Sequence, residues 1–194
     1  MEPLTLILLG AGTLALMGSK PKSGDGPLPM YEGGIPTAIF DLPDVLPEKQ
    51  GGNFSREFDD VFYHWGTYYS IPFCLLKAHA IRESSLKASA YRQEPNGKAS
   101  YGLMQILWWP NSNRFKAWGY PDDAIQDGSI LYDANVNVDI ACRIILDNFE
   151  VHGNLRDAIN SYNTGRNEKT RPAPHNYVND VIRHYETLLG RKIV

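Results

Sequence analysis

Apolar side chains recur at helical spacing in the part of the chain that follows Ser55. A first set occupies positions i, i+3, i+4, i+7 and i+11, which defines one face of an α-helix. Its members are Phe58, Val61, Phe62, Trp65 and Tyr69. Pro72 suits the first turn of a second helix, which runs to Glu83. The apolar positions of that second helix are Cys74, Leu75, Ala78 and Ile81.

The second half of the chain repeats this spacing in three segments. Residues 134–151 predict a long helix, and residues 175–189 predict the last one. Between them, Asn154 caps a shorter helix that stops at Gly165. The positions expected to face inward are Val138, Ala141, Ile145 and Phe149 in the first of these helices, and Tyr177, Val181, Tyr185 and Leu188 in the last. No convincing alternating run is present, so the sequence predicts a mainly α domain over residues 55–194.

A hydrophobic segment precedes this domain. Residues 4–17 carry no charge and, as a helix, extend about 21 Å, short of the roughly 30 Å hydrocarbon core of a bilayer. A signal-peptide core fits that length, but Glu2 precedes the segment without any Lys or Arg, and Lys20 and Lys22 follow it. We therefore expect a helix over residues 1–18 that inserts into or anchors at a membrane. A helix buried in the domain core is the alternative.

The segment that joins this helix to the domain is rich in structure-breaking residues. Residues 18–54 contain seven glycines and six prolines, a density that excludes regular structure over any useful length. We therefore expect a flexible Gly/Pro-rich linker over residues 19–54. The short apolar run at residues 37–46 could dock on the domain or on a partner.

Charge separates the two parts of the chain. Residues 1–53 hold three Lys/Arg and six Asp/Glu, which leaves sixteen of each sign in residues 54–194. Because a neutral domain has no electrostatic footprint for nucleic acid, we expect no nucleic-acid partner. Eleven Tyr and four Trp suit stacking on sugar rings, although core burial accounts for most of them.

Cysteine and histidine give no sign of a metal site. Cys74 and Cys142 fall in apolar helical patterns, where a free thiol behaves as a small buried hydrophobe, and a disulfide is the less favoured alternative. None of the five histidines has a paired carboxylate or nucleophile at a telling spacing. We expect no metal and no cofactor, and we assign the histidines no role.

Glu83 is the candidate for chemistry. It follows an apolar helix and Arg82, and partial desolvation by such neighbours favours the neutral form of a carboxyl. A neutral carboxylic acid can protonate a leaving oxygen, which is what cleavage of a glycosidic bond requires. A solvated glutamate at a helix end is the plain alternative, and only the motifs that accompany Glu83 argue against it.

Three short motifs occur in a fixed order: Glu83-Ser84, Gly102-Leu103-Met104-Gln105 and Ser161-Tyr162-Asn163. Together they resemble the soluble lytic transglycosylase (SLT) family, and the resemblance covers about residues 57–190. It implies a lysozyme-like fold and a lyase that cleaves the β-1,4 bond between N-acetylmuramic acid and N-acetylglucosamine in peptidoglycan. Glu83 would act first as acid and then as base toward the sugar's own 6-hydroxyl, forming a 1,6-anhydro product without water. The substrate's N-acetyl oxygen would stabilise the anomeric carbon in place of a second carboxylate.

The resemblance also implies roles for the other motif residues. Ser84 and Gln105 would bind the saccharide or position the catalytic carboxylate. Met104 would form an apolar wall that raises the pKa of that carboxylate, with core burial as the alternative. Tyr162 would direct its hydroxyl at the carboxylate or the substrate acetamido group, although burial alone also explains it. Asn163 would meet substrate or simply end its helix.

Two departures from the family pattern matter. The stretch between Glu83 and Gln105 is a few residues longer than in compact members, which predicts that residues 92–97 form a loop at the rim of the cleft. If Glu94 in this loop activated a water, the product would be a reducing sugar and the enzyme a lysozyme-type muramidase. Ala173 stands where the family places an acid.

These expectations describe a membrane-associated enzyme that acts on glycan strands in the periplasm or cell wall. A phage virion component that penetrates the envelope during genome entry fits the N-terminal segment, and so does an enzyme of a bacterial secretion assembly. Two alternatives lie outside the enzyme class. One is a non-catalytic module that grips peptidoglycan, and the other is a structural assembly protein with a vestigial domain.

Overall fold

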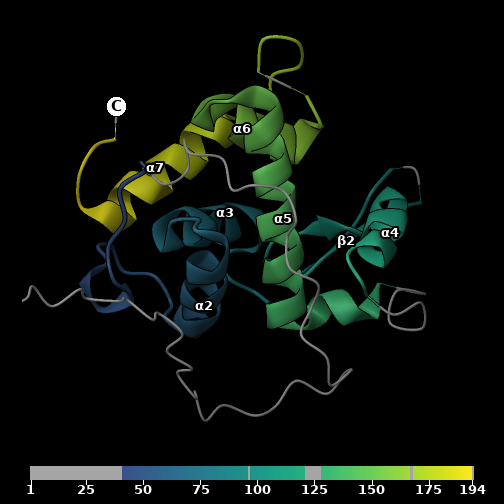
Figure 1. The fold of residues 1–194 in the computed structure, drawn as a ribbon, viewed down its shortest axis with the longest axis horizontal. Coiled ribbons are helices and arrows are strands. Elements are labelled where there is room, and N and C mark those ends of the chain that lie inside the picture. Colours follow the sequence, from purple (N-terminus) through teal and green to yellow (C-terminus); the bar gives the residue numbers. More distant parts are fainter. Residues whose placement is uncertain (1–40, 96, 121–127, 167, 194) are drawn as a thin grey trace, which may run out of the picture.

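The computed structural model describes residues 41–193 except 96, 121–127 and 167 (Figure 1). The expected membrane segment at residues 1–18 and the linker before residue 41 lie outside the described residues. Within the part that is described, no helix is long and apolar enough to cross a lipid bilayer.

The described chain is mainly helical, as predicted, with one small sheet. The helices are α2 (Asp59–Tyr69), α3 (Phe73–Ser84), α4 (Trp108–Ala117), α5 (Ala134–His152), α6 (Leu155–Thr164) and α7 (Tyr177–Leu189). Two 3₁₀ turns, η1 (Pro47–Lys49) and η3 (Ser129–Tyr132), accompany them. The strands β1 (Tyr91–Gln93), β2 (Ala99–Tyr101) and β3 (Ile106–Leu107) form an antiparallel sheet in sequence order.

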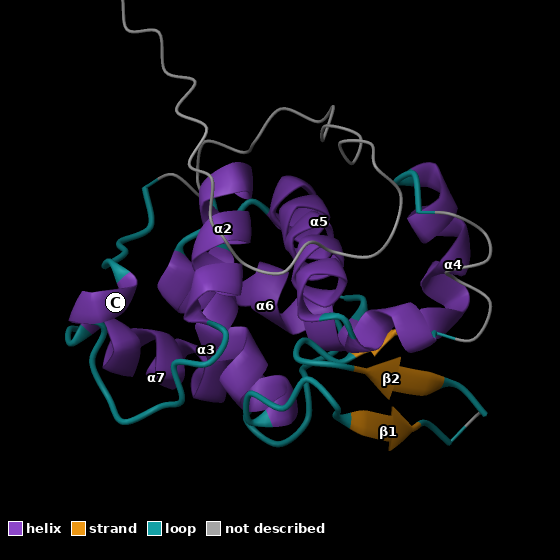
Figure 2. Cartoon of the chain, turned by 90° about the horizontal axis from the view of Figure 1, so that it is seen from below, coloured by secondary structure: helices purple, strands orange, loops and turns teal. Residues whose placement is uncertain are grey.

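Helix α5 runs through the centre of the molecule. Helices α2, α3 and α7 lie on one side of it, and the sheet and α4 lie on the other (Figures 1 and 2). Its four predicted inward positions are all buried, and the Asp133 carboxylate caps its first turn by accepting from two backbone amides. Cys142 on α5 and Cys74 on α3 are both buried free thiols.

The helix ends follow the capping residues that the sequence suggested. Asn154 Oδ1 accepts from the Asp157 amide at 2.9 Å and begins α6, and Gly165 ends it with φ 68°. Helix α7 starts two residues later than expected. His175 and Asn176 have φ of 54° and 55°, a left-handed conformation that cannot continue into a right-handed helix.

The sheet and α4 were not predicted. The strands are only two or three residues long, which is too short to produce a visible alternation of apolar and polar positions. The stretch expected as a rim loop begins inside β1, since Arg92 and Gln93 pair with Ser100 and Ala99 of β2, so its first residues belong to a β-hairpin.

The end of the expected linker is not flexible, because it packs on the domain, as the sequence allowed for the run at residues 37–46. The Asp44 carboxylate accepts from the amides of Phe73 at 2.6 Å and Cys74 at 3.0 Å, and so caps the N-terminus of α3. The Tyr185 hydroxyl donates to the carbonyl of Pro43. The residues before Ser55 therefore hold the start of the helix that carries Glu83.

A buried ionic cluster fixes the same segment a few residues later. Lys77 Nζ, fully buried on α3, donates to Asp59 Oδ1 at 2.5 Å and to Gln50 Oε1 at 2.6 Å. Gln50 in turn donates to Asp59. A buried ammonium needs partners of this kind, because an unpaired charge is costly in the interior. The described part of the linker thus supplies one of the two groups that satisfy Lys77.

Candidate active site

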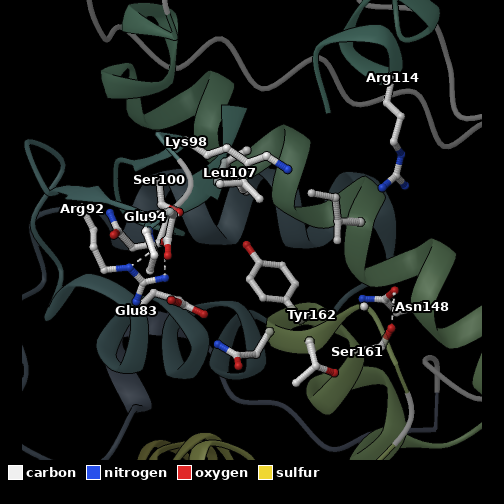
Figure 3. A pocket seen from close by; sticks show the side chains of 17 residues that line it. Glu83, Arg92, Glu94, Lys98, Ser100, Leu107, Arg114, Asn148, Ser161 and Tyr162 are labelled. Atoms are coloured by element: carbon white, nitrogen blue, oxygen red, sulfur yellow. Dashed lines mark hydrogen bonds and ion pairs between the residues drawn. The ribbon is translucent and has the colours of Figure 1, made fainter. Parts of the chain in front are cut away.

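A cavity of about 450 Å³ opens between the β-hairpin and the end of α3 on one side and α5 and α6 on the other (Figure 3). Its lining is rich in polar and charged side chains. They include Glu83, Arg92, Glu94, Lys98, Ser100, Gln105, Arg114, Asn148, Ser161, Tyr162 and Asn163. Residues from all three sequence motifs therefore meet at this cavity.

Glu83 reaches the cavity from the last turn of α3. Its side chain is partly buried, and its Oε1 accepts a 2.5 Å hydrogen bond from the hydroxyl of Tyr177 on α7. Helix α3 ends immediately afterwards, since Ser85 and Leu86 have φ of 54° and 62°. Such left-handed residues without glycine are uncommon and gather at functional sites. The chain turns sharply away and leaves the carboxyl facing the cavity.

The surroundings of Glu83 keep its carboxyl protonated up to about neutral pH. Burial raises the pKa of Glu83 from an ordinary 4.5 to about 7. The Tyr177 hydrogen bond and the guanidiniums of Arg92 and Arg82 act in the opposite direction on this pKa, while the negative charge of Glu94 raises it further. Desolvation is the largest of these effects. A carboxyl with this pKa can both give and take a proton close to neutrality.

Tyr162 does not direct its hydroxyl at Glu83. The Tyr162 hydroxyl instead donates to the Met104 carbonyl at 2.8 Å. Its ring lies with the centroid 4.9 Å from that of His79, and it borders the cavity between Glu83 and Asn148 (Figure 3). The tyrosine that contacts Glu83 is Tyr177.

The Gly-Leu-Met-Gln motif forms a tight turn that Asn137 of α5 holds in place. Asn137 Oδ1 accepts from the Met104 amide at 2.7 Å, and its Nδ2 donates to the carbonyls of Tyr101 and Leu131. Gly102 has φ 76°, and a Cβ there would lie 2.3 Å from the Leu131 carbonyl oxygen. Only glycine fits this position.

Gln105 follows this turn in a strained conformation, with φ 47°. Its side-chain nitrogen donates to the carbonyls of Gly102 at 3.1 Å and Ala90 at 3.3 Å. Both amide protons are thereby directed at the backbone, which orients the side chain at the cavity wall. Gln105 is therefore a fixed part of the lining.

Ser84 and Met104 are placed beside the cavity and not among the side chains that line it. The Ser84 hydroxyl donates to the Ala80 carbonyl at 3.2 Å and accepts from the Lys87 amide at 3.1 Å, so it holds the end of α3. The Met104 side chain is fully buried in the core, and its backbone bonds Asn137 and Tyr162. Asn163, in contrast, is exposed at the cavity edge.

The β-hairpin brings a second carboxylate to the cavity. Glu94 Oε1 accepts from Arg92 Nε at 2.8 Å and from the Ser100 hydroxyl at 3.0 Å, and Arg92 pairs directly with Ser100 across the two strands. These charge-assisted bonds hold Glu94 at the cavity wall beside a cation (Figure 3). Among the described residues no cluster of three or more His, Cys, Asp or Glu could hold a metal ion.

Sequence reasoning missed Tyr177, His79 and Asn137 as site residues. Tyr177 was predicted only as an inward position of the last helix. His79 lies four residues before Glu83, and this spacing places both on one face of α3, which is a signal that the sequence does contain. The His79 Nδ1 lies 3.3 Å from the Tyr177 hydroxyl oxygen. For Asn137, buried inside α5, the sequence offers no comparable signal.

Comparison with protein families and with known proteins agrees with the resemblance that the sequence motifs indicated. The family model described as "Transglycosylase SLT domain" matches residues 60–181. Protein IpgF of Shigella flexneri is 31% identical over 120 residues, which cover 62% of this chain and 75% of that protein, and IpgF of Shigella sonnei is 30% identical over the same length.

Two solved structures share the fold. The 70 kDa soluble lytic transglycosylase of Escherichia coli aligns with a TM-score of 0.55 and 22% identity, and an inactive mutant of the lytic transglycosylase Slt of Pseudomonas aeruginosa aligns with 0.57 and 17%. Each alignment covers 72% of this chain but only 25% of the larger one. The comparison with these two structures therefore concerns the fold of one region of each.

Proposed function

The chain belongs to the transglycosylase SLT domain family and is therefore a lytic transglycosylase, and on this premise we propose that Glu83 cleaves the glycan strands of peptidoglycan. The observation that carries the proposal is the state of Glu83 itself. It is a partly buried carboxyl at a polar cavity, it accepts a hydrogen bond from Tyr177, and its pKa is raised to about 7. A general acid for neutral pH needs this environment.

The reaction proceeds in two proton transfers. Neutral Glu83 gives its proton to the glycosidic oxygen as the bond from that oxygen to the anomeric carbon of N-acetylmuramic acid breaks. The substrate's own acetamido oxygen stabilises the positive anomeric carbon, which removes the need for a second enzyme carboxylate. The Glu83 carboxylate then takes the proton of the 6-hydroxyl as that oxygen bonds to the anomeric carbon. The product is a 1,6-anhydro sugar, and Glu83 is protonated again.

The other motif residues have supporting roles in the proposal. Gln105 and Asn163 at the cavity lining bind the sugar's polar groups. Tyr162 holds the Met104 carbonyl and so joins α6 to the Gln105 turn. Ser84 positions Glu83 by holding the end of α3.

A lysozyme-type hydrolase is the second candidate, because Glu94 lines the same cavity as Glu83. A carboxylate that activates water must be free to accept a proton. Glu94 Oε1 already accepts from Arg92 and Ser100, so the proton of an activated water would have to go to Oε2. Replacing Glu94 with Gln decides the point. Loss of all product release in Glu94→Gln, with reducing ends in the wild type, would support hydrolysis.

We further propose that the enzyme acts at the cell wall and is tethered to a membrane by residues 1–18. The basis is the sequence alone. A phage virion component and an envelope-spanning bacterial assembly both suit such a tethered enzyme. Detection in purified particles would support the viral setting, and Sec-dependent export with cleavage near Gly18 would contradict it.

Activity on purified peptidoglycan tests the central proposal against the non-catalytic module. The full-length chain is expected to release soluble fragments, and Glu83→Gln is expected to release none while it keeps its fold by circular dichroism. Binding to peptidoglycan without turnover, equal in both proteins, would establish a module that only grips glycan.

A further inference from the structure

His79 is a buried titratable group that the reaction described above does not use. It lies one turn before Glu83 on α3 and is only 1% exposed. Its Nδ1 lies 3.3 Å from the hydroxyl oxygen of Tyr177, and the same hydroxyl bonds Glu83 Oε1 at 2.5 Å. Three side chains from two helices thus form a line that ends at the carboxyl facing the cavity.

The number of protons that His79, Tyr177 and Glu83 carry determines which group donates in each of the two hydrogen bonds. Burial lowers the pKa of His79 to about 3, so its imidazole is neutral and carries one N–H. The Tyr177 hydroxyl has one proton and two neighbours. When Glu83 is a carboxylate it has no proton to give, so the short contact requires Tyr177 to donate to Oε1. A hydrogen bond between Nδ1 and the tyrosine oxygen then requires Nδ1 to be the donor.

We propose that His79 is a positioning residue, which donates its Nδ1–H to the Tyr177 hydroxyl oxygen and so holds the tyrosine proton on Glu83 Oε1. With Oε1 engaged as an acceptor, the proton that Glu83 transfers resides on Oε2. The opposite tautomer would accept the tyrosine proton and leave the Glu83 acid proton to bond the tyrosine oxygen, away from substrate. The catalytic part of this inference rests on the proposed function, whereas the tautomer does not.

Other charged groups also influence Glu83, but the hydrogen bonds through Tyr177 are the route by which we expect His79 to act on the Glu83 carboxyl. Arg92, Arg82 and Glu94 influence the charge of Glu83 from the hairpin and from α3. Through hydrogen bonds His79 reaches Glu83 by way of Tyr177, and its ring also lies 4.9 Å, centroid to centroid, from Tyr162 of α6. Its effect on catalysis should therefore depend on the tyrosine hydroxyl.

Two variants test this dependence on the full-length chain with soluble glycan fragments as substrate. His79→Phe keeps a ring but has no donor, and we expect kcat to fall by up to about ten-fold with KM unchanged, the upper end of the effect of one hydrogen bond between neutral groups. The pH above which activity falls should rise. His79→Asn places an amide N–H near the position of Nδ1 and should restore most of kcat. His152→Phe, at the C-terminal end of α5 and outside the cavity lining, is the matched control and should change neither quantity.

The double variant separates positioning from general packing. In a Tyr177→Phe background, His79→Phe should cause no further loss of kcat. An equal loss in both backgrounds would overturn the proposal, as would a failure of His79→Asn to recover activity when its melting temperature matches the wild type.

The closing measurement does not depend on activity. Nitrogen-15 spectra of histidine-labelled full-length protein, assigned with His79→Asn, should show the His79 Nδ1 in its protonated form. An unprotonated Nδ1 would overturn the proposal whether or not the chain cleaves glycan. A protonated Nδ1 in a chain that cleaves nothing would keep the tautomer and reject the proposed function instead.

Discussion

The Tyr177 hydroxyl donates a 2.5 Å hydrogen bond to Glu83, although the two residues are 94 positions apart in the sequence. The bond joins α7 to the end of α3 and stabilises the charged form of the carboxyl. Activity that needs protonated Glu83 should therefore fall as pH rises through about 7. Without this bond the carboxyl would lose its proton at a higher pH.

Tyr177→Phe should accordingly lower kcat by about ten-fold and move the fall in activity to higher pH. The pH dependence of kcat/KM measures both effects. Tyr185→Phe is a matched control on the same helix, because its hydroxyl bonds the Pro43 carbonyl and not the site. A Tyr177→Phe profile that falls at lower pH would contradict the geometry.

Glu83→Gln should stabilise the protein at alkaline pH. The folded carboxyl, with its pKa raised from 4.5 to about 7, binds more protons than the unfolded one between these values. The free energy of unfolding of the wild type therefore declines through that window by an amount that reaches about 3 kcal/mol above pH 7. Glutamine has no such penalty.

Urea unfolding of the wild type and Glu83→Gln at pH 4 and pH 8 measures the difference. The two proteins should be nearly equal at pH 4, and the variant should be more stable at pH 8 by about 2–3 kcal/mol, since water in the cavity screens part of the effect. A variant that is less stable at pH 8 would show that the Glu83 charge is favourable in the fold.

Gly102→Ala should destabilise the domain strongly and remove activity. The new Cβ would lie 2.3 Å from the Leu131 carbonyl and against Asn137, in a backbone with φ 76°. We expect a loss of at least about 3 kcal/mol in denaturant unfolding. Gly97→Ala is a matched control with the same φ but no atom within 4 Å, and should cost only about 1 kcal/mol. Equal losses would mean that the close approach at Gly102 relaxes freely.

Removing residues 1–53 should destabilise the catalytic domain. The truncation removes the Asp44 cap of α3, the carbonyl acceptor of Tyr185 and one of the two partners of buried Lys77. These losses together should cost at least about 3 kcal/mol in urea unfolding. A chain that begins at residue 41 keeps all three contacts and should match the full-length protein. Equal stability of the chain that begins at residue 54 would contradict this role of the segment.

Helical periodicity carried most of the fold prediction because the helices are long and amphipathic. The inward positions of α5 and α7 and the cap at Asn154 are confirmed. The sheet was not predicted because its strands of two or three residues are shorter than the run of about four residues over which alternation becomes visible. The sequence allowed the run at residues 37–46 to dock on the domain, but the partners of Asp44 and Gln50 were not predicted, because a Gly/Pro-rich composition describes local backbone freedom and does not indicate which side chains find buried partners.

Only residues within the three sequence motifs, and Glu94 in the stretch between them, could be predicted as candidate site residues. The motifs indicate Glu83, Gln105, Tyr162 and Asn163, and the cavity brings these four together. The motifs predicted that the Tyr162 hydroxyl points at Glu83 or at the substrate acetamido group, whereas in the structure the hydroxyl that bonds Glu83 is that of Tyr177 on another helix. Contacts between distant helices depend on packing that a single sequence does not display.

Mass spectrometry of the fragments that the full-length chain releases from purified peptidoglycan tests the central claim most directly. The wild type should release fragments that end in 1,6-anhydro-N-acetylmuramic acid, and these should be absent with Glu83→Gln. Fragments that end in reducing N-acetylmuramic acid, released by the wild type, would contradict the transglycosylase reaction and assign a catalytic role to Glu94.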